Sequence, residues 1–261
     1  MKRVIFVLGD KGGTGKSVVA RYLWDRLRSR GDAKAFDADG QVGQLAQFYA
    51  VRNAAGSLVE PQPASGVEPI LLHAEERGER DQGVYRIVEC TAEVVLVDCP
   101  ATSLTVFERL QADWSFFDDL QNHGFEPVMV NVVTPYRASL ANVARTLALV
   151  PSAKNVVVFN TAFGRRSDFR LWDGTEQKPS RGKVLLTERG GVEVVMPALN
   201  AGSAAMIDAE NVMFSGAVSG DGDLMSFDRQ YTANWLKACD AAFELVAETL
   251  GLASQLVQVS A

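Results

Sequence analysis

Residues 9–17 read GDKGGTGKS and combine closely spaced glycines with a lysine and a serine. Gly12, Gly13 and Gly15 permit positive φ and close backbone approach, so successive N–H groups can curl around phosphate oxygens. Lys16 can then reach the β and γ phosphates of a nucleotide, and the Ser17 hydroxyl can bind Mg²⁺. The stretch therefore predicts a nucleotide-phosphate site, which we assign to Gly12, Gly13, Thr14, Gly15, Lys16, Ser17 and Val18.

The flanking residues predict the elements that hold this loop. The apolar run 4–8 is typical of a buried parallel strand, and the apolar residues of 18–27 recur near the helical period of 3.6. A loop between a strand and a helix places bound phosphate at the positive end of the helix dipole. Asp10 is the one departure, because it stands where the P-loop pattern has its first glycine.

Carboxylates follow two further expected strands. Asp37 and Asp39 come at the end of a short strand that starts at Ala33, and Asp98 ends the apolar run 94–98. Ligands collect at the carboxyl edge of open parallel sheets, so we expect these side chains near the loop. Asp98 can hold a magnesium-bound water there. The alternative for both Asp37 and Asp39 is that they only shape a turn.

Together these motifs resemble the ParA/MinD family of deviant Walker A P-loop ATPases. The second lysine, Lys11 in KGGTGKS, carries the resemblance, and DADG and DCP look like the switch I and switch II motifs of the family. The resemblance implies that Lys11 reaches the nucleotide of the other subunit in a dimer, that Asp39 orients the attacking water, and that Asn160 contacts adenine. The catalytic set is then Lys11, Lys16 and Asp39, the metal set Ser17 and Asp98, and the cofactors ATP and Mg²⁺.

Strands and helices alternate along the chain, which predicts an α/β fold with a doubly wound, mainly parallel β-sheet flanked by helices. The resemblance implies a P-loop NTPase of the SIMIBI type. We expect a single ATPase domain over residues 1–261, with a basic loop or insert at 165–189. Within it we expect one helix over 104–121, a connection at 216–222 and a last helix over about 231–250.

Composition sets the broad class. The chain has 261 residues, a net charge of −6, 47% hydrophobic and 22% charged residues, as in ordinary soluble globular proteins. Its three cysteines lack paired spacing, which argues against a disulfide framework or a cysteine zinc site. No apolar run is long enough to span a bilayer, and the first core strand leaves no room for a signal peptide. We therefore expect a cytoplasmic protein without integral membrane contact, associated with the nucleoid if it binds DNA.

Residues 165–189 concentrate positive charge in an otherwise acidic chain. The segment carries +3, so the rest of the chain carries −9. Phe169 and Trp172 are interleaved with its arginines, a mixture that suits either a nucleic-acid backbone or a protein partner, while an ordinary solvated loop is the alternative. The residues that we expect to contact DNA non-specifically are Arg165, Arg166, Arg170, Lys178, Arg181 and Lys183.

The functional interpretation is an ATPase that forms a homodimer with Mg-ATP and hydrolyses it slowly, which switches its binding to DNA or a partner protein. The resemblance implies plasmid or chromosome partition, cargo positioning, or plasmid maintenance linked to conjugation. The stretch TAFGRRSDFRLWDG before the expected strand VEVVMPAL looks closer to plasmid stability and conjugation relatives than to chromosomal ParA. Two alternatives stay open. One is an ATP-dependent metabolic ligase of the dethiobiotin-synthetase type, against which Lys11 argues. The other is a nucleotide-binding scaffold with negligible hydrolysis.

Overall fold

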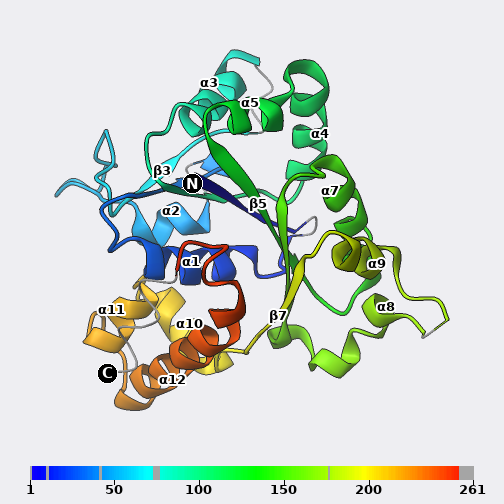
Figure 1. The fold of residues 1–261 in the computed structure, drawn as a ribbon. Coiled ribbons are helices and arrows are strands. Elements are labelled where there is room, and N and C mark those ends of the chain that lie inside the picture. The colour runs from blue at the N-terminus through cyan, green and yellow to red at the C-terminus, as the bar shows by residue number, and fades with distance from the viewer. Residues whose placement is uncertain (1, 10–11, 41–42, 73–76, 176, 253–261) are drawn as a thin grey trace.

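A seven-stranded sheet forms the centre of the computed structural model, which describes residues 2–9, 12–40, 43–72, 77–175 and 177–252 (Figure 1). The strand order is β3-β2-β4-β1-β5-β6-β7, and all neighbouring strands run parallel. This confirms the doubly wound α/β fold. The strands are β1 (Lys2–Leu8), β2 (Ala33–Asp37), β3 (Val67–Pro69), β4 (Val94–Asp98), β5 (Phe125–Val133), β6 (Lys154–Asn160) and β7 (Val192–Met196).

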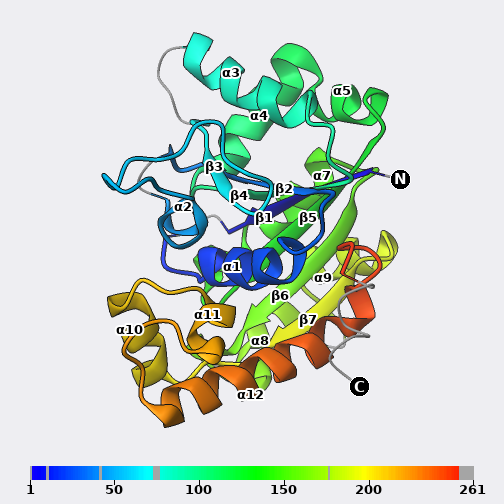
Figure 2. The ribbon, with the colours of Figure 1, turned by 90° about the vertical axis from the view of Figure 1, so that its left-hand side faces the viewer.

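Helices cover both faces of the sheet, as Figure 2 shows. One face packs against α1 (Lys16–Leu27), α2 (Gln44–Tyr49), α10 (Ala201–Ala209), α11 (Phe214–Ser219) and α12 (Ser226–Phe243). The other face packs against α3 (Arg77–Val88), α4 (Ser103–Trp114), α5 (Phe116–Asn122), α7 (Val143–Leu149), α8 (Arg170–Asp173) and α9 (Arg181–Glu188), with α6 (Arg137–Leu140) leading into α7.

β1 lies in the middle of the sheet, and its side chains enter two different cores. Ile5 and Val7 pack with α1, α11 and α12, whereas Val4, Phe6 and Leu8 pack with α3, α4 and α5. Successive side chains of a strand point to opposite faces, so a strand that is buried on both faces must be apolar at every position. This explains the uninterrupted run that precedes the phosphate loop.

Three local expectations were wrong, each where tertiary packing decides the local structure. The expected helix 104–121 is two helices, because Ser115 between them adopts a left-handed φ of 56°. That break lets Phe116 and Phe117 both contact the Phe6 ring. The expected connection at 216–222 overlaps α11, whose Phe214 packs on Trp235 of α12. The last long helix begins earlier than expected, at Ser226, and gives way to a 3₁₀ turn after Phe243.

Two expectations from composition concern the cysteines and the membrane. Cys90, Cys99 and Cys239 all carry free thiols, and the last two are buried. In the part of the chain that the structure describes, no helix is both long enough and apolar enough to cross a bilayer.

Candidate functional site

The phosphate loop connects the end of β1 to the start of α1 and is tightly folded. Gly13 and Gly15 adopt φ of 78° and 87°. A Cβ at Gly9 would lie 2.8 Å from Thr14 Oγ1 and 2.9 Å from Lys16 Cγ, so the loop closes back on its own first residue. Among the described residues no side chain caps the first turn of α1, and that turn contains no acidic residue. The loop thus presents a helix N-terminus suited to an anion.

Gly15 is the loop position at which a side chain is least tolerated. Besides its φ of 87°, a Cβ there would lie only 2.2 Å from Asn160 Nδ2. We expect Gly15→Ala to lower the free energy of unfolding by about 2 kcal/mol, because left-handed backbone is costly for alanine and the Asn160 amide must move. Gly12→Ala is the matched control, since no atom lies within 4 Å of its Cβ position. Denaturant unfolding measures both variants, and equal losses would contradict the prediction.

Two aspartates end neighbouring strands at the site, and they have different surroundings. Asp37 of β2 stands in register with Asp98 of β4. Asp37 accepts hydrogen bonds from the backbone N–H groups of Ala46, at 2.7 Å, and Asp39, at 3.2 Å. It therefore shapes the turn between β2 and α2. Burial raises the pKa of Asp37 above its usual range despite these bonds.

Asp98 is also buried, but its carboxyl is less completely hydrogen-bonded than that of Asp37. Burial, followed by the charge of Asp37, raises the pKa of its carboxyl well above the usual range. A hydrogen bond from the Ser17 hydroxyl and the Lys16 ammonium lower this pKa, so the structure brings the three predicted side chains together. Even so, Asp98 Oδ1 has no hydrogen-bond partner among the described residues. A buried carboxylate oxygen of this kind is costly unless a cation or donor meets it.

These donors fit a magnesium ion. Mg²⁺ prefers hard oxygen ligands and binds through one or two protein groups plus phosphate oxygens and water. The Ser17 hydroxyl and the unpartnered oxygen of Asp98 are donors of that kind, next to a loop shaped for phosphate. A cation here would offset the carboxylate charge that burial disfavours.

The other two predicted catalytic residues are less well defined by the structure. Asp39 lies two residues beyond the end of β2, is exposed, and forms a backbone bridge with Leu71. Its charge raises the pKa of Asp98, which places it near the site rather than inside it. Lys11, which we expected to act across a dimer, lies outside the described residues, as does Asp10. The roles of these residues stay predictions.

Asn160, at the end of β6, holds the phosphate loop. Its Nδ2 donates to the Thr14 carbonyl at 2.9 Å, and its Oδ1 accepts from the Ala162 N–H at 3.1 Å. Each amide atom keeps further hydrogen-bonding capacity, so the expected adenine contact is compatible with these bonds. The bond to Thr14 was missed at the sequence level, because only the fold brings residues 146 positions apart together.

Comparison with known proteins identifies the fold. No protein-family model and no curated protein sequence matches the chain. Among solved structures, a ParA family ATPase from Chlorobium tepidum is similar over 90% of this chain and 97% of its own, with 15% identity and a TM-score of 0.50. The chain has the ParA/MinD ATPase fold.

Two more structures show lower similarity. The septum site-determining protein MinD from Pyrococcus horikoshii, complexed with Mg-ADP, covers 91% of this chain and 96% of its own, with 15% identity and a TM-score of 0.48. A plasmid partition protein from Borrelia burgdorferi covers 91% and 97%, with 10% identity and a TM-score of 0.42.

In this ParA/MinD fold the basic segment 165–189 is packed onto the sheet. Phe169 and Trp172 are buried beside β6, where both rings meet Phe159 edge to face. They are therefore core residues and cannot stack on exposed bases, contrary to the interpretation from their spacing. The pattern misled because aromatic residues between arginines look the same in a nucleic-acid surface and in the edge of a core.

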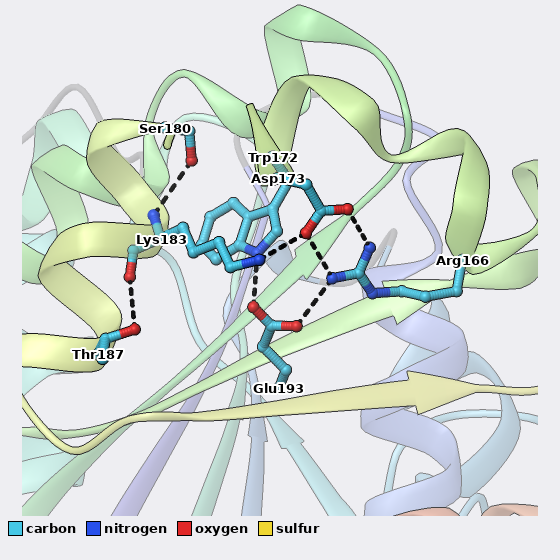
Figure 3. Close-up of polar contacts among 7 residues, drawn as sticks. All are labelled: Arg166, Trp172, Asp173, Ser180, Lys183, Thr187 and Glu193. Carbon is cyan, nitrogen blue, oxygen red and sulfur yellow. Dashed lines mark hydrogen bonds and ion pairs between the residues drawn. The ribbon is translucent and has the colours of Figure 1, made fainter. Parts of the chain in front are cut away.

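Two of the six predicted DNA-contacting residues are held in an ion-pair network (Figure 3). Arg166 binds Asp173 at 2.7 Å and Glu193 at 2.9 Å, and Lys183 binds Asp173 at 2.7 Å. Trp172 Nε1 donates to Glu193 at 2.7 Å, which joins the network to β7. These contacts link α8, α9 and β7, so they position the segment. The other four, Arg165, Arg170, Lys178 and Arg181, are exposed.

The network predicts a pH dependence of stability. Hydrogen bonds from Arg166 lower the pKa of Asp173 from 3.8 to about 2. A carboxyl whose folded pKa is depressed stabilises the fold above its unfolded pKa, and that contribution is lost as the pH falls through the folded value. We expect Asp173→Asn to cost at most about 1 kcal/mol at pH 7, because the pair is partly solvated. Unfolding measured between pH 7 and pH 2, with exposed Asp113→Asn as control, tests this: the Asp173→Asn deficit should shrink below about pH 4.

Proposed function

We propose that the chain is a magnesium-dependent ATPase whose ATP-bound form dimerises, and whose slow hydrolysis switches its binding to DNA or a partner protein. One observation carries the proposal: Lys16, Ser17 and the buried, incompletely satisfied carboxylate of Asp98 meet beside a glycine loop at the start of α1. The ParA/MinD fold supports it, because the site lies at the carboxyl ends of β1 and β4, where ligands bind in such sheets.

Each residue then has a defined task. Lys16 and the loop N–H groups bind the phosphates, while Ser17 and Asp98 hold Mg²⁺, which neutralises phosphate charge when bound. Asp39 orients the attacking water, and Lys11 of the second subunit stabilises the charge that develops on the phosphates. Asn160 supports the loop and contacts the base. None of these tasks needs fast turnover, since a switch requires only a difference in binding between two states.

The proposed role is partition of a plasmid or chromosome, cargo positioning, or plasmid maintenance linked to conjugation. If DNA is the surface that is bound, the exposed cations Arg165, Arg170, Lys178 and Arg181 are the residues proposed to contact its phosphates. Such binding would weaken steeply with salt.

The Asp39→Ala variant tests the hydrolytic step. We expect ATP binding to be retained and phosphate release to fall by about 100-fold, because a residue that positions or activates the nucleophile contributes at least that much. Asp113→Ala, which removes an exposed carboxylate of α4, is the control. Calorimetry and single-turnover phosphate release provide the two readouts. Unchanged hydrolysis in the variant would remove Asp39 from the mechanism. Fast turnover of the parent protein that requires a small carboxylic acid would establish the ligase instead.

A further inference from the structure

An open groove of about 590 Å³ is lined by residues of the α6–α7 segment and of the α8–α9 segment. Its apolar lining consists of Leu140, Ala141, Ala144, Ala148 and Leu171. Leu171 contributes exposed apolar surface to this lining, because its side chain is 56% exposed. Its alanines have small side chains, so another backbone can approach the α6–α7 segment closely.

The walls of the groove are fixed in place. On the α8–α9 side, Asp173 of α8 binds Lys183 of α9, and Arg166 ties both to Glu193 of β7 (Figure 3). Between the two sides, the Arg189 guanidinium after α9 donates to the Leu147 carbonyl of α7. A surface that is held in shape before binding loses little conformational entropy when it is occupied.

The charged residues of the groove indicate which kind of ligand it can bind. Arg137, Arg145 and Arg181 line the groove, and none of the described residues that line it is acidic, although the chain as a whole carries −6. Arg145 pairs with Glu108 of α4, but both side chains are exposed and such pairs contribute little. A phosphate backbone would match the arginines and leave the apolar lining without a partner. An amphipathic helix with an apolar stripe and flanking carboxylates matches both.

We propose that this groove binds an acidic amphipathic helix of a partner protein. The groove also has a route to the nucleotide site. Val143 and Thr146, on the opposite side of α7, line a small cavity together with Gly9 of the phosphate loop and Pro100 after β4. An occupant that shifts α7 would therefore act on both the loop and the turn after Asp98. This coupling rests on the proposed ATPase function, whereas binding in the groove does not.

The test uses the full chain without nucleotide, so that its result is independent of hydrolysis. The probe is a fluorescent designed helix of about 15 residues, with leucines at i, i+3, i+4 and i+7 and glutamates flanking this stripe. We expect saturable binding by anisotropy. A second peptide, with every glutamate replaced by lysine, differs in charge alone. It should bind at least about tenfold more weakly, because its lysines are repelled by the arginines of the groove.

Two variants place the binding in the groove. Ala144→Glu puts a bulky negative charge into the apolar lining. Arg181→Glu reverses a charge of the lining at the first residue of α9, where an acidic residue interacts favourably with the helix dipole. Arg181→Glu therefore should not unfold the protein. Each should weaken the acidic helix by about tenfold or more, whereas Arg52→Glu, outside the groove, should not.

The inference is overturned if the acidic helix shows no saturable binding, or if neither groove variant weakens it. It is also overturned if duplex DNA, and not the helix, is the probe that both groove variants weaken. Stimulation of phosphate release by the helix is measured separately. Peptide binding without stimulation would support the groove and contradict the coupling through α7.

Discussion

Lys16→Ala is expected to raise the Kd for ATP by at least about 100-fold. Lys16 is buried at the start of α1 and close to Asp98, where few other charges can replace it. Charge-assisted hydrogen bonds contribute about 1.5–3 kcal/mol each, so losing contacts with two phosphates costs more than the 2.7 kcal/mol that corresponds to about 100-fold. Isothermal titration calorimetry with Mg-ATP measures the effect.

The control for this prediction is Lys237→Ala, which removes an exposed lysine from α12. Its affinity for ATP should match that of the parent protein. A Lys16→Ala protein that is folded, by circular dichroism, and still binds ATP within about threefold of the parent would show that phosphate is bound elsewhere.

Asp98→Asn is expected to remove the response to magnesium without destabilising the nucleotide-free protein. The amide has nearly the same shape as the carboxyl but carries no charge, so the burial cost that raises the pKa of Asp98 disappears. The variant loses an anionic ligand for Mg²⁺. In the parent protein, saturation with Mg-ATP at 100 times its Kd should stabilise the fold by about 2.7 kcal/mol, and most of this gain should be absent in Asp98→Asn.

Asp37→Asn provides the contrasting control, because Asp37 stands in register with Asp98 but accepts two backbone hydrogen bonds. It should destabilise the nucleotide-free protein, since an amide nitrogen cannot accept the bond that the second carboxylate oxygen accepts. Thermal unfolding with increasing magnesium and ATP separates the two variants. If Asp98→Asn is the less stable one and keeps its magnesium response, Asp98 is a structural residue.

The fold could be predicted from the sequence because the relevant patterns are local. Uninterrupted apolar runs such as 94–98 indicate buried parallel strands, and the glycines before Lys16 mark a strand-to-helix turn. The proximity of Ser17, Lys16 and Asp98 followed from one rule, that parallel strands present their carboxyl ends at the same edge.

What could not be predicted depends on contacts between distant residues. From the sequence, Trp172 resembles an aromatic residue of the surface. In the structure it is buried beside β6, and its Nε1 donates a hydrogen bond to Glu193 of β7. Ser115 adopts a left-handed backbone conformation although it is neither glycine nor asparagine, the residues that usually signal this conformation. The conformation goes with the packing of Phe116 and Phe117 against Phe6. The number of basic residues in 165–189 suggested more free positive charge than the segment has, because Arg166 and Lys183 are both paired with Asp173.

The position of β1 also determines the order in which this protein can be completed as it is made. β1 precedes the other six strands of the sheet in the sequence, yet its two neighbours are β4 and β5, so its second ladder closes only after Asn131 has been synthesised. The Asn160 bond to Thr14 comes later still. Contacts this distant in sequence form slowly, because loop closure must precede them. The phosphate loop is thus translated well before the residues that complete its packing.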